Sequence, residues 1–403
     1  MPKITISKKV MKSALFESLT EQGYTIRGNN FIPPVMNDKE SIRAKHSLQR
    51  IERLKQEAAV FHKYGEQYVT QYFANGDQIN VDAFDPVLIQ VNSEDWTSIL
   101  FRIATMLWSI PVSRGYGRRL RFLVIDRSNG CLIGIIGLGD PVFNLKVRDE
   151  HIGWSANQRK DKLYHVMDAY ILGAVPPYNY LMAGKYLAGL FAINEIREAF
   201  KTKYNGRTTI IEGKDKVDEL VLITTTSALG RSSIYNRVNY IDAGQQKRTL
   251  LTSLGYTSGY GHFHVSEEIF SMMRTFLDER NDSYANGYKF GNGPNWRMRV
   301  IEKTIRHLGY PKLPVLHHGI QREVFICPLA SNYKEFLLGE DVQPDYFDLS
   351  MADYTNYFVR RHMNQRYITK NNEILQFESQ QLYEQLNYDL NQKNKRAEAY
   401  EVV

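Results

Sequence analysis

A short segment, residues 113–121, is rich in arginine and contains no acidic residue. Its arginines are Arg114, Arg118, Arg119 and Arg121. A guanidinium presents a planar fork of donors that fits a phosphate, and Tyr116 adds a ring on which an exposed base can stack. Arg231 would extend the set if it faced the same way. The segment predicts a nucleic-acid contact, with internal pairing of Arg118 and Arg121 to Asp126 or Glu150 as the alternative.

A second basic stripe lies on a long helix that we predict over residues 38–73. Apolar residues spaced by three and four mark its buried side. The neighbouring stripe consists of Arg43, His46, Arg50 and Arg53. This stripe is either a solvated helix face or a basic ridge that follows a nucleic-acid backbone.

Metal-dependent cleavage would need clustered carboxylates, and the sequence offers few. The best acidic candidates are Asp149-Glu150 and the triplet 212–214, Glu-Gly-Lys, but no acidic residue on an upstream strand clearly pairs with either. His262 and His264 alternate along a predicted strand and so share a face, without an acidic partner at a fixed spacing. We therefore predict no metal site, and the absence of a GxxxxGK[ST] motif argues against ATP binding through a P-loop.

The elements that must position these residues indicate an α+β protein. Strands are predicted at 120–125, 131–138, 167–175, 220–226, 261–265 and 322–327, and helices at 96–108, 181–203, 232–240 and 296–308. The first two strands form a hairpin with Asn129-Gly130 in its turn. We expect a helical N-terminal region with a small hairpin (1–95), a core domain with a mixed sheet (96–277), a Gly/Asn-rich linker (278–296), a small C-terminal α+β unit (297–370) and an exposed, Gln/Asn-rich helical tail (371–403).

The order of elements in the core domain is similar to that of the GNAT acyltransferases. That resemblance implies an acyl cofactor whose pyrophosphate meets the start of the helix at 181–203, near Gly184 and Lys185, and a general acid at Tyr235. The usual Q/R-x-x-G-x-G/A fingerprint is not intact. The alternatives are a helix packed closely on the sheet through small residues, a buried tyrosine, or a scaffold without this chemistry, and we predict no cofactor.

The composition is that of an ordinary globular protein with a modest positive charge. Of the 403 residues, 43% are hydrophobic and 24% charged, and the net charge is +7. The two cysteines, Cys131 and Cys327, lie in apolar segments and cannot build a disulfide framework or a zinc site. The N-terminus lacks a signal-peptide pattern and no apolar run is long enough to span a membrane, so we expect a cytoplasmic protein without a membrane partner.

Five blocks of sequence resemble those of the DruA family, the signature proteins of the type I Druantia anti-phage defence system. They are GRRLRFLV at 117–124, RDEHIGWS at 148–155, LGRSSIYN at 229–236, LGYTSGYG at 254–261 and HGIQREVF at 318–325. The resemblance implies a role in antiviral defence beside other Druantia proteins, including a very large helicase-like protein. It supplies no agreed catalytic residues.

Our leading hypothesis is a defence component that binds DNA or another nucleic acid, single-stranded or branched, alongside a helicase-like partner. The alternatives are a GNAT-like transferase that modifies nucleic acid or protein, and an assembly subunit whose tail docks the other Druantia proteins.

Overall fold

The computed structural model describes residues 5–35, 38–110, 117–206, 218–287, 294–310, 314–340 and 342–398. The chain forms two compact units, and each combines segments that are distant in the sequence. Unit 1 comprises Met1–Gln49 and Tyr256–Arg322, and unit 2 comprises Arg50–Gly255 and Glu323–Val403. The domains expected from the sequence are consecutive segments, whereas each of these units is discontinuous. The chain begins in unit 1, returns to it at Tyr256 and goes back to unit 2 at Glu323.

Unit 1 packs helices against a small β-hairpin. Ser7 caps α1 (Lys8–Glu21), because its hydroxyl accepts a hydrogen bond from the Val10 amide at 3.2 Å. The antiparallel strands β1 (Thr25–Arg27) and β2 (Asn30–Ile32) confirm the predicted hairpin. Helices α9 (Glu267–Asp278) and α10 (Pro294–His307) complete the unit. Its core includes Met11, Leu15, Leu19, Phe31, Met273, Phe276, Val300 and Ile301.

The predicted long helix is two helices. α2 (Lys39–Lys45) ends at His46, and α3 (Ser47–Tyr72) begins at the next residue. The periodic apolar pattern runs through the break, so spacing alone does not reveal it. The break at His46 lies close to the boundary between the two units, which follows Gln49.

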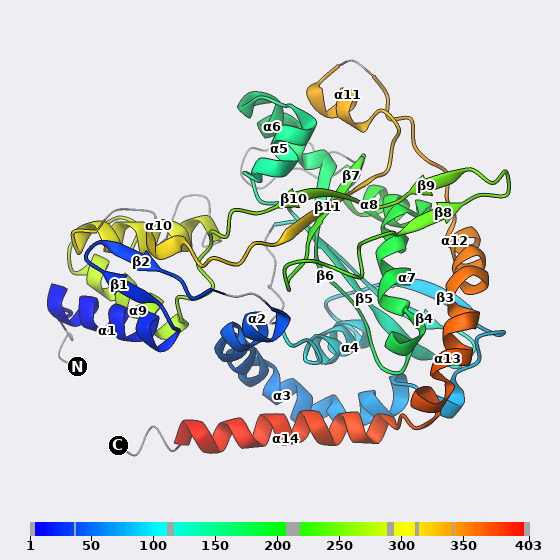
Figure 1. The fold of residues 1–403 in the computed structure, drawn as a ribbon, viewed down its shortest axis with the longest axis horizontal. Coiled ribbons are helices and arrows are strands. Elements are labelled where there is room, and N and C mark those ends of the chain that lie inside the picture. The colour runs from blue at the N-terminus through cyan, green and yellow to red at the C-terminus, as the bar shows by residue number, and fades with distance from the viewer. Residues whose placement is uncertain are drawn as a thin grey trace. The chain divides into compact units, whose positions relative to one another are not determined.

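Unit 2 is built on a seven-stranded mixed sheet with the order β10-β11-β7-β6-β5-β4-β3 (Figure 1). The strands are β3 (Pro86–Gln90), β4 (Arg119–Asp126), β5 (Cys131–Gly139), β6 (Val166–Ala174), β7 (Leu222–Thr226), β10 (Thr252–Tyr256) and β11 (Glu323–Pro328). β6 and β7 pair in parallel, whereas β3 to β6 form an antiparallel meander and β11 pairs antiparallel to β7. The hairpin of β4 and β5 confirms the predicted turn, in which Gly130 has a φ of +74°.

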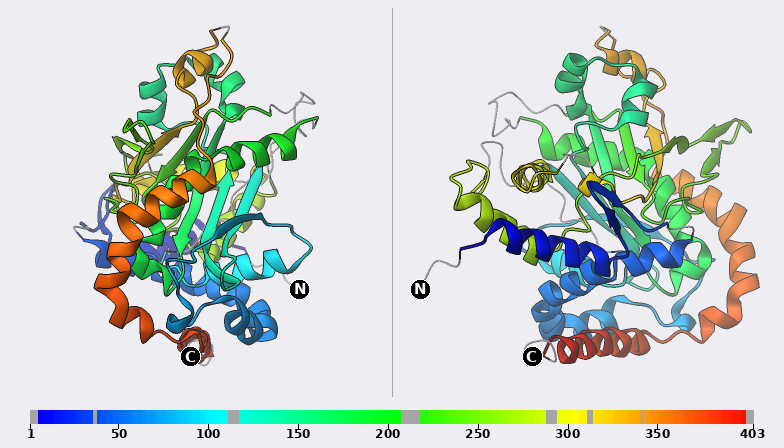
Figure 2. Two further views of the ribbon diagram at one scale, coloured as in Figure 1. Left: turned by 90° about the vertical axis from the view of Figure 1, so that its right-hand side faces the viewer. Right: turned by 60° about the vertical axis from the view of Figure 1, so that its left-hand side comes forward.

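Helices cover both faces of this sheet (Figure 2). Alternate residues of β4 separate the two cores: Leu120 and Phe122 belong to one, and Leu123 and Ile125 to the other. We call the first side face A and the second face B. Face A packs on α7 (Ala183–Gly189), α8 (Asn194–Tyr204), α12 (Met351–Phe358) and α13 (Asn364–Leu375). Face B packs on α3 and α4 (Trp96–Thr105), and near the starts of β6 and β7 on α5 (Lys146–Ile152) and α11 (Tyr333–Leu338).

The C-terminal region differs from the prediction in two ways. The predicted strand at 322–327 is β11, which joins the central sheet instead of forming a separate small unit. The tail helix α14 (Ser379–Glu398) lies along α3 (Figure 1) and is not simply exposed, since Leu386 and Leu390 pack with Leu54 and Phe61. The apolar stripe of the otherwise polar helix α14 therefore packs against α3 of the same chain.

Two further predicted elements are absent from the described residues. Residues 233–237 form bends and a turn within the segment where a short helix was predicted, and β8 (Asn239–Ile241) follows them. Residues 261–265 also form a turn, and the strand of that region is β10, which ends at Tyr256. No helix in the described ranges is long and apolar enough to cross a membrane.

Candidate functional site

Arg118 is used inside the protein. Its residue is 8% exposed, and its Nε donates to Asp140 Oδ1 at 2.7 Å. Its remaining nitrogens donate to the carbonyl oxygens of Tyr164 at 2.7 Å and Val166 at 3.3 Å. The internal pairing considered for this arginine therefore occurs, with Asp140 in place of Asp126 or Glu150. Arg114 and Tyr116 lie outside the described residues.

Arg119 and Arg121 begin β4 on face B, on the side opposite Leu120 and Phe122. Arg119 is exposed and Arg121 is half-buried. The guanidinium carbon of Arg121 lies 5.4 Å from the centre of the Phe101 ring. Within the part of the chain that the structure describes, no carboxylate forms an ion pair with Arg121.

Two glycines of β5 separate these arginines from polar groups on the next strands. The register aligns Arg119 with Gly139, Gly139 with Asp168, and Asp168 with Thr224. A Cβ at Gly137 would lie 2.9 Å from the hydroxyl oxygen of Tyr170, so the Tyr170 ring lies over that glycine. Burial raises the pKa of Tyr170, and the charges of Arg121, Arg119 and Arg53 act in the opposite direction. The Tyr170 hydroxyl therefore lies near several guanidinium groups.

Asp168 is the unexpected member of this row. Its carboxylate accepts a hydrogen bond from the Thr224 hydroxyl at 2.7 Å. Burial raises the pKa of Asp168 to about 6, although the Thr224 hydrogen bond and the charge of Arg148 both lower it. Sequence reasoning missed this residue, and the available signal was a single acidic residue inside an otherwise apolar strand, VMDAYILGA.

We expect Asp168→Asn to raise the melting temperature at pH 8 and to raise it by about half as much at pH 5. A carboxyl whose folded pKa lies above its unfolded value destabilises the fold when ionised; this penalty is full above the folded pKa, declines as the pH falls below about 6, and is gone only below the unfolded value of 3.8. Asparagine keeps a hydrogen-bonding side chain of the same shape. The measurement is thermal unfolding at both pH values, with Asp161→Asn, an exposed change, as control. Destabilisation at pH 8 would contradict a desolvated carboxylate at this position.

The other predicted basic residues are mostly engaged in ion pairs. Arg43 pairs with Glu40, Arg50 pairs with Asp389 at 3.1 Å, and Arg53 pairs with Glu57 at 2.8 Å. The solvated-face interpretation fails for Arg53, whose side chain is 17% exposed. Arg231 is exposed on the loop that follows β7. Arg43 belongs to unit 1, whereas Arg50 and Arg53 belong to unit 2.

Asp149 is the centre of a hydrogen-bond network at α5. Its carboxylate accepts from Arg148 Nη2 at 2.7 Å, from Trp154 Nε1 at 3.0 Å and from Arg159 Nη1 at 3.1 Å. It also accepts from the Leu145 amide at 3.0 Å. Both carboxylate oxygens are thereby engaged, which explains the RDEHIGWS block as a structural motif.

No group of three or more potential ligands in the described residues could hold a metal ion. His264 is buried and its Nε2 contacts the Val315 carbonyl oxygen at 2.5 Å. His262 shares neither a strand nor an acidic neighbour with it. The triplet 212–214 lies outside the described residues.

The residues considered for an acyl cofactor make internal contacts. Lys185 Nζ donates to the Asn236 carbonyl at 2.7 Å, and a Cβ at Gly184 would lie 3.6 Å from Ile234. Tyr235 packs against Phe325 with ring centres 5.4 Å apart, and its buried hydroxyl has a raised pKa. The segment around residues 234–236 thus lies against both α7 and β11, close to where the cofactor was expected.

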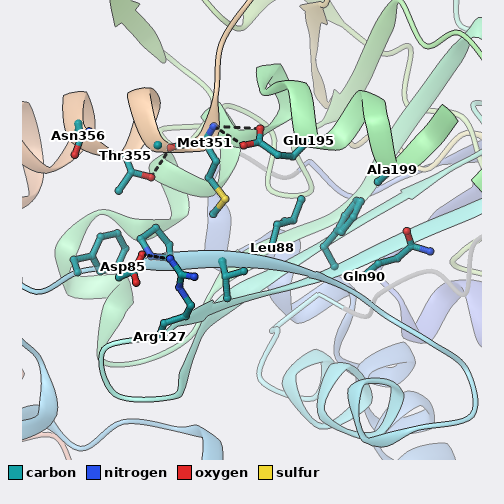
Figure 3. Close-up of a pocket in the computed structure, with 14 residues that line it drawn as sticks. Asp85, Leu88, Gln90, Arg127, Glu195, Ala199, Met351, Thr355 and Asn356 are labelled. Carbon is teal, nitrogen blue, oxygen red and sulfur yellow. Dashed lines mark hydrogen bonds and ion pairs between the residues drawn. The ribbon is translucent and has the colours of Figure 1, made fainter. Parts of the chain in front are cut away.

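A cavity of about 450 Å³ lies beside the edge strand β3 (Figure 3). Leu88, Phe122 and Met351 give it an apolar lining. Its charged groups already have partners: Arg127 pairs with Asp85 at 2.8 Å, and Glu195 accepts from the Met351 amide at 2.9 Å. The cavity therefore resembles a packing gap between β3 and α12 more than a site with free charges.

Comparison with known proteins identifies the family. The family described as "Druantia protein DruA" matches residues 36–339. A protein of Escherichia coli (strain UMEA 4076-1), named Druantia protein DruA, is 42% identical over 349 residues, which cover 87% of this chain and 85% of that protein. No solved structure matches the chain, so the expected likeness to GNAT acyltransferases is not confirmed. The matched length and the identity together show that the chain belongs to the DruA family of Druantia proteins.

Proposed function

We propose that this chain acts in anti-phage defence as a Druantia component and binds nucleic acid at the start of β4, through side chains on the face B side of that strand. The basic strip that we assign to this contact consists of Arg119, Arg121 and Tyr170. Membership of the DruA family supports the role in defence, and the resemblance noted in the sequence implies a helicase-like partner. The observation that carries the binding proposal is that Arg121 is half-buried without a carboxylate partner among the described residues.

Arg121 is half-buried, and no carboxylate in the described ranges pairs with it. Removing a charge from water is costly unless an opposite charge replaces the lost hydration. A phosphate would do so, since the guanidinium can donate two parallel hydrogen bonds to its oxygens. Gly137 and Gly139 place no side chain beside the arginines, and the Tyr170 ring occupies that space, where it offers a face for a base to stack on.

We expect Arg121→Ala to weaken binding of single-stranded and duplex DNA by about tenfold to a hundredfold, because a charge-assisted hydrogen bond contributes about 1.5–3 kcal/mol. The loss should be similar for all sequences, and the slope of log K against log salt should fall by about one. Fluorescence-anisotropy titration of labelled DNA between roughly 50 and 200 mM salt measures both quantities.

Arg127→Ala is the matched control. Arg127 follows the other end of β4, its side chain is 63% exposed, and it pairs with Asp85. Both variants lose one positive charge, so a change in net charge alone would weaken them equally. Equal losses in the two variants would remove the basic strip from the proposal, and absence of binding by the wild-type chain at low salt would remove nucleic-acid binding by the isolated protein.

A further inference from the structure

Unit 1 contains a compact group of buried basic side chains that the proposed function does not use. We call it the basic cluster, and it comprises Lys45, His46, His264, His318 and Arg322. His46, His264 and His318 are 3%, 1% and 4% exposed. Phe263 joins the group, because its ring centre lies 4.3 Å from that of His46 and 4.6 Å from that of His318.

The contact between Arg322 and His46 fixes the position of a proton. Arg322 Nη2 lies 3.4 Å from His46 Nε2. A guanidinium can only donate, so His46 accepts at Nε2 and carries its proton at Nδ1. That Nδ1 is buried and has no hydrogen-bond partner in the structure, and neither does Nε of Arg322. Two donors of this pair are therefore left without an acceptor.

Lys45 adds a third donor group. Its ammonium nitrogen is buried without a hydrogen-bond partner and lies 4.1 Å from the centre of the Tyr24 ring. Tyr24 in turn stacks on His264, with ring centres 5.6 Å apart. Burial lowers the pKa of Lys45 to about 8, and the Lys45 charge lowers the pKa of both His46 and His264. The ammonium thus lies close to both imidazoles.

No acidic side chain balances these groups. Among the residues that the structure describes, no Asp or Glu forms an ion pair with Lys45, His46 or Arg322. Burying unpaired charges costs several kcal/mol each, and native proteins usually offset that cost with a carboxylate or a bound anion. We propose that the basic cluster of unit 1 binds a phosphate-type oxyanion, held by Lys45 Nζ and His46 Nδ1, while Arg322 lies at Nε2 on the other side of the His46 ring and fixes its tautomer.

The remaining members of the cluster hold these donors in place. His318 Nδ1 accepts from the Ile320 amide at 3.1 Å, so this imidazole is anchored by its own loop. His264 contacts the Val315 carbonyl through Nε2. Phe263 lies beside His46 and Arg322 and limits access of water to them, which strengthens any charge-assisted hydrogen bond formed there.

The test is thermal unfolding of the full chain in chloride buffer, with inorganic phosphate added at constant ionic strength. We expect phosphate to raise the melting temperature saturably, by about 5 °C at roughly one hundred times its Kd. Lys45→Met should abolish this rise. Lys12→Met is the matched control, since Lys12 also lies over aromatic rings of unit 1 but is exposed.

The phosphate could be free or belong to a nucleic acid, and oligonucleotides with and without a 5′-phosphate separate these sources. A larger rise with the 5′-phosphorylated form assigns the cluster to a terminal phosphate, and a rise with inorganic phosphate alone assigns it to the free ion. A melting temperature that does not respond to any of these probes, or a full response in Lys45→Met, overturns the proposal. Should Lys45→Met fail to fold, broadening of the ³¹P signal of phosphate by the wild-type chain supports the oxyanion site, and an unchanged signal overturns it.

Discussion

Asp149→Asn is expected to destabilise unit 2 by about 3–5 kcal/mol, the cost of leaving a buried charge without its partner. The charge is that of Arg148, whose side chain is 0% exposed. Its Nε and Nη2 both donate to Asp149 Oδ1, at 2.9 and 2.7 Å, and its other hydrogen bonds go to the carbonyls of Val142 and Phe143. The carbonyls cannot neutralise a guanidinium, so the carboxylate of Asp149 is its main counter-charge.

Asparagine cannot replace that carboxylate, although it has the same shape. It carries no charge, and its amide nitrogen can only donate, while every group around Asp149 is also a donor. Trp154, Arg159 and the Leu145 amide would compete for a single oxygen. The change therefore affects the packing of α5 on the starts of β6 and β7, where Ile152 and Trp154 contribute to the core.

Urea unfolding of the two variants Asp149→Asn and Glu150→Gln measures this effect with a neighbour as control. Glu150 is the next residue of α5, and its side chain is 64% exposed with a distant contact to Lys146 at 3.7 Å. We expect Glu150→Gln to change the free energy of unfolding by less than about 0.5 kcal/mol. Similar stabilities for the two variants would show that Arg148 is not held by Asp149.

The local elements of the fold follow from the sequence where the signal is local. The Asn129-Gly130 turn and the apolar runs on either side of it determine the hairpin of β4 and β5, and Ser7 determines the start of α1. The partners of β11 could not be deduced in this way. Its apolar run indicates a strand, but pairing with β7, about a hundred residues earlier in the chain, depends on long-range contacts that the pattern does not encode.

The candidate site shows the same division. The arginines of 118–121 stand out by composition. The alternation of side chains that continues into β4 places Arg118 and Arg121 on opposite sides, so Arg118 is buried in an ion pair and Arg121 is not. The carboxylate of that ion pair belongs to Asp140, which directly follows the end of β5. Asp168 was visible only as an acidic residue in an apolar strand. Its importance arises from the register that places it between Gly139 and Thr224.

Lowering the pH from 7 to 4.5 in a buffer free of phosphate and sulfate is expected to unfold unit 1 before unit 2. Burial lowers the pKa of His46 and His264 to about 3 and that of His318 to about 2, and the charges of Lys45 and Arg322 add to the effect. His262, which is also in unit 1 but outside the basic cluster, acts in the same direction, because burial lowers its pKa to about 4. No carboxylate in the described residues offsets them.

The sign of the effect follows from proton binding. In the unfolded chain these histidines take up protons near pH 6.5, whereas in the folded unit they remain neutral down to about pH 3. Each histidine therefore costs about 1.4 kcal/mol of stability for every pH unit below 6.5, and has no such effect above it. Among the described residues of unit 2, burial lowers the pKa of His165 to about 4 and also lowers the pKa of His151 and His362, which are only partly buried. The raised pKa of Asp168 acts in the opposite direction and favours the folded state of unit 2 as the pH falls through about 6.

Pulse-labelling hydrogen exchange at a constant labelling pH, after incubation at each test pH, distinguishes the two units by their peptides. Helices α1, α9 and α10 should lose protection at a higher pH than the strands of the central sheet. His264→Gln provides the decisive comparison, because glutamine stays neutral and can still donate to the Val315 carbonyl. This variant should shift the acid transition of unit 1 to lower pH and leave that of unit 2 unchanged.

Equal acid transitions for both units would mean that the basic cluster is not desolvated, and the same result would remove the physical basis for an oxyanion site there. If added phosphate instead protects unit 1 at pH 5 to 6, where a bound oxyanion would stabilise protonated His46, the acid sensitivity and the proposed ligand share one cause.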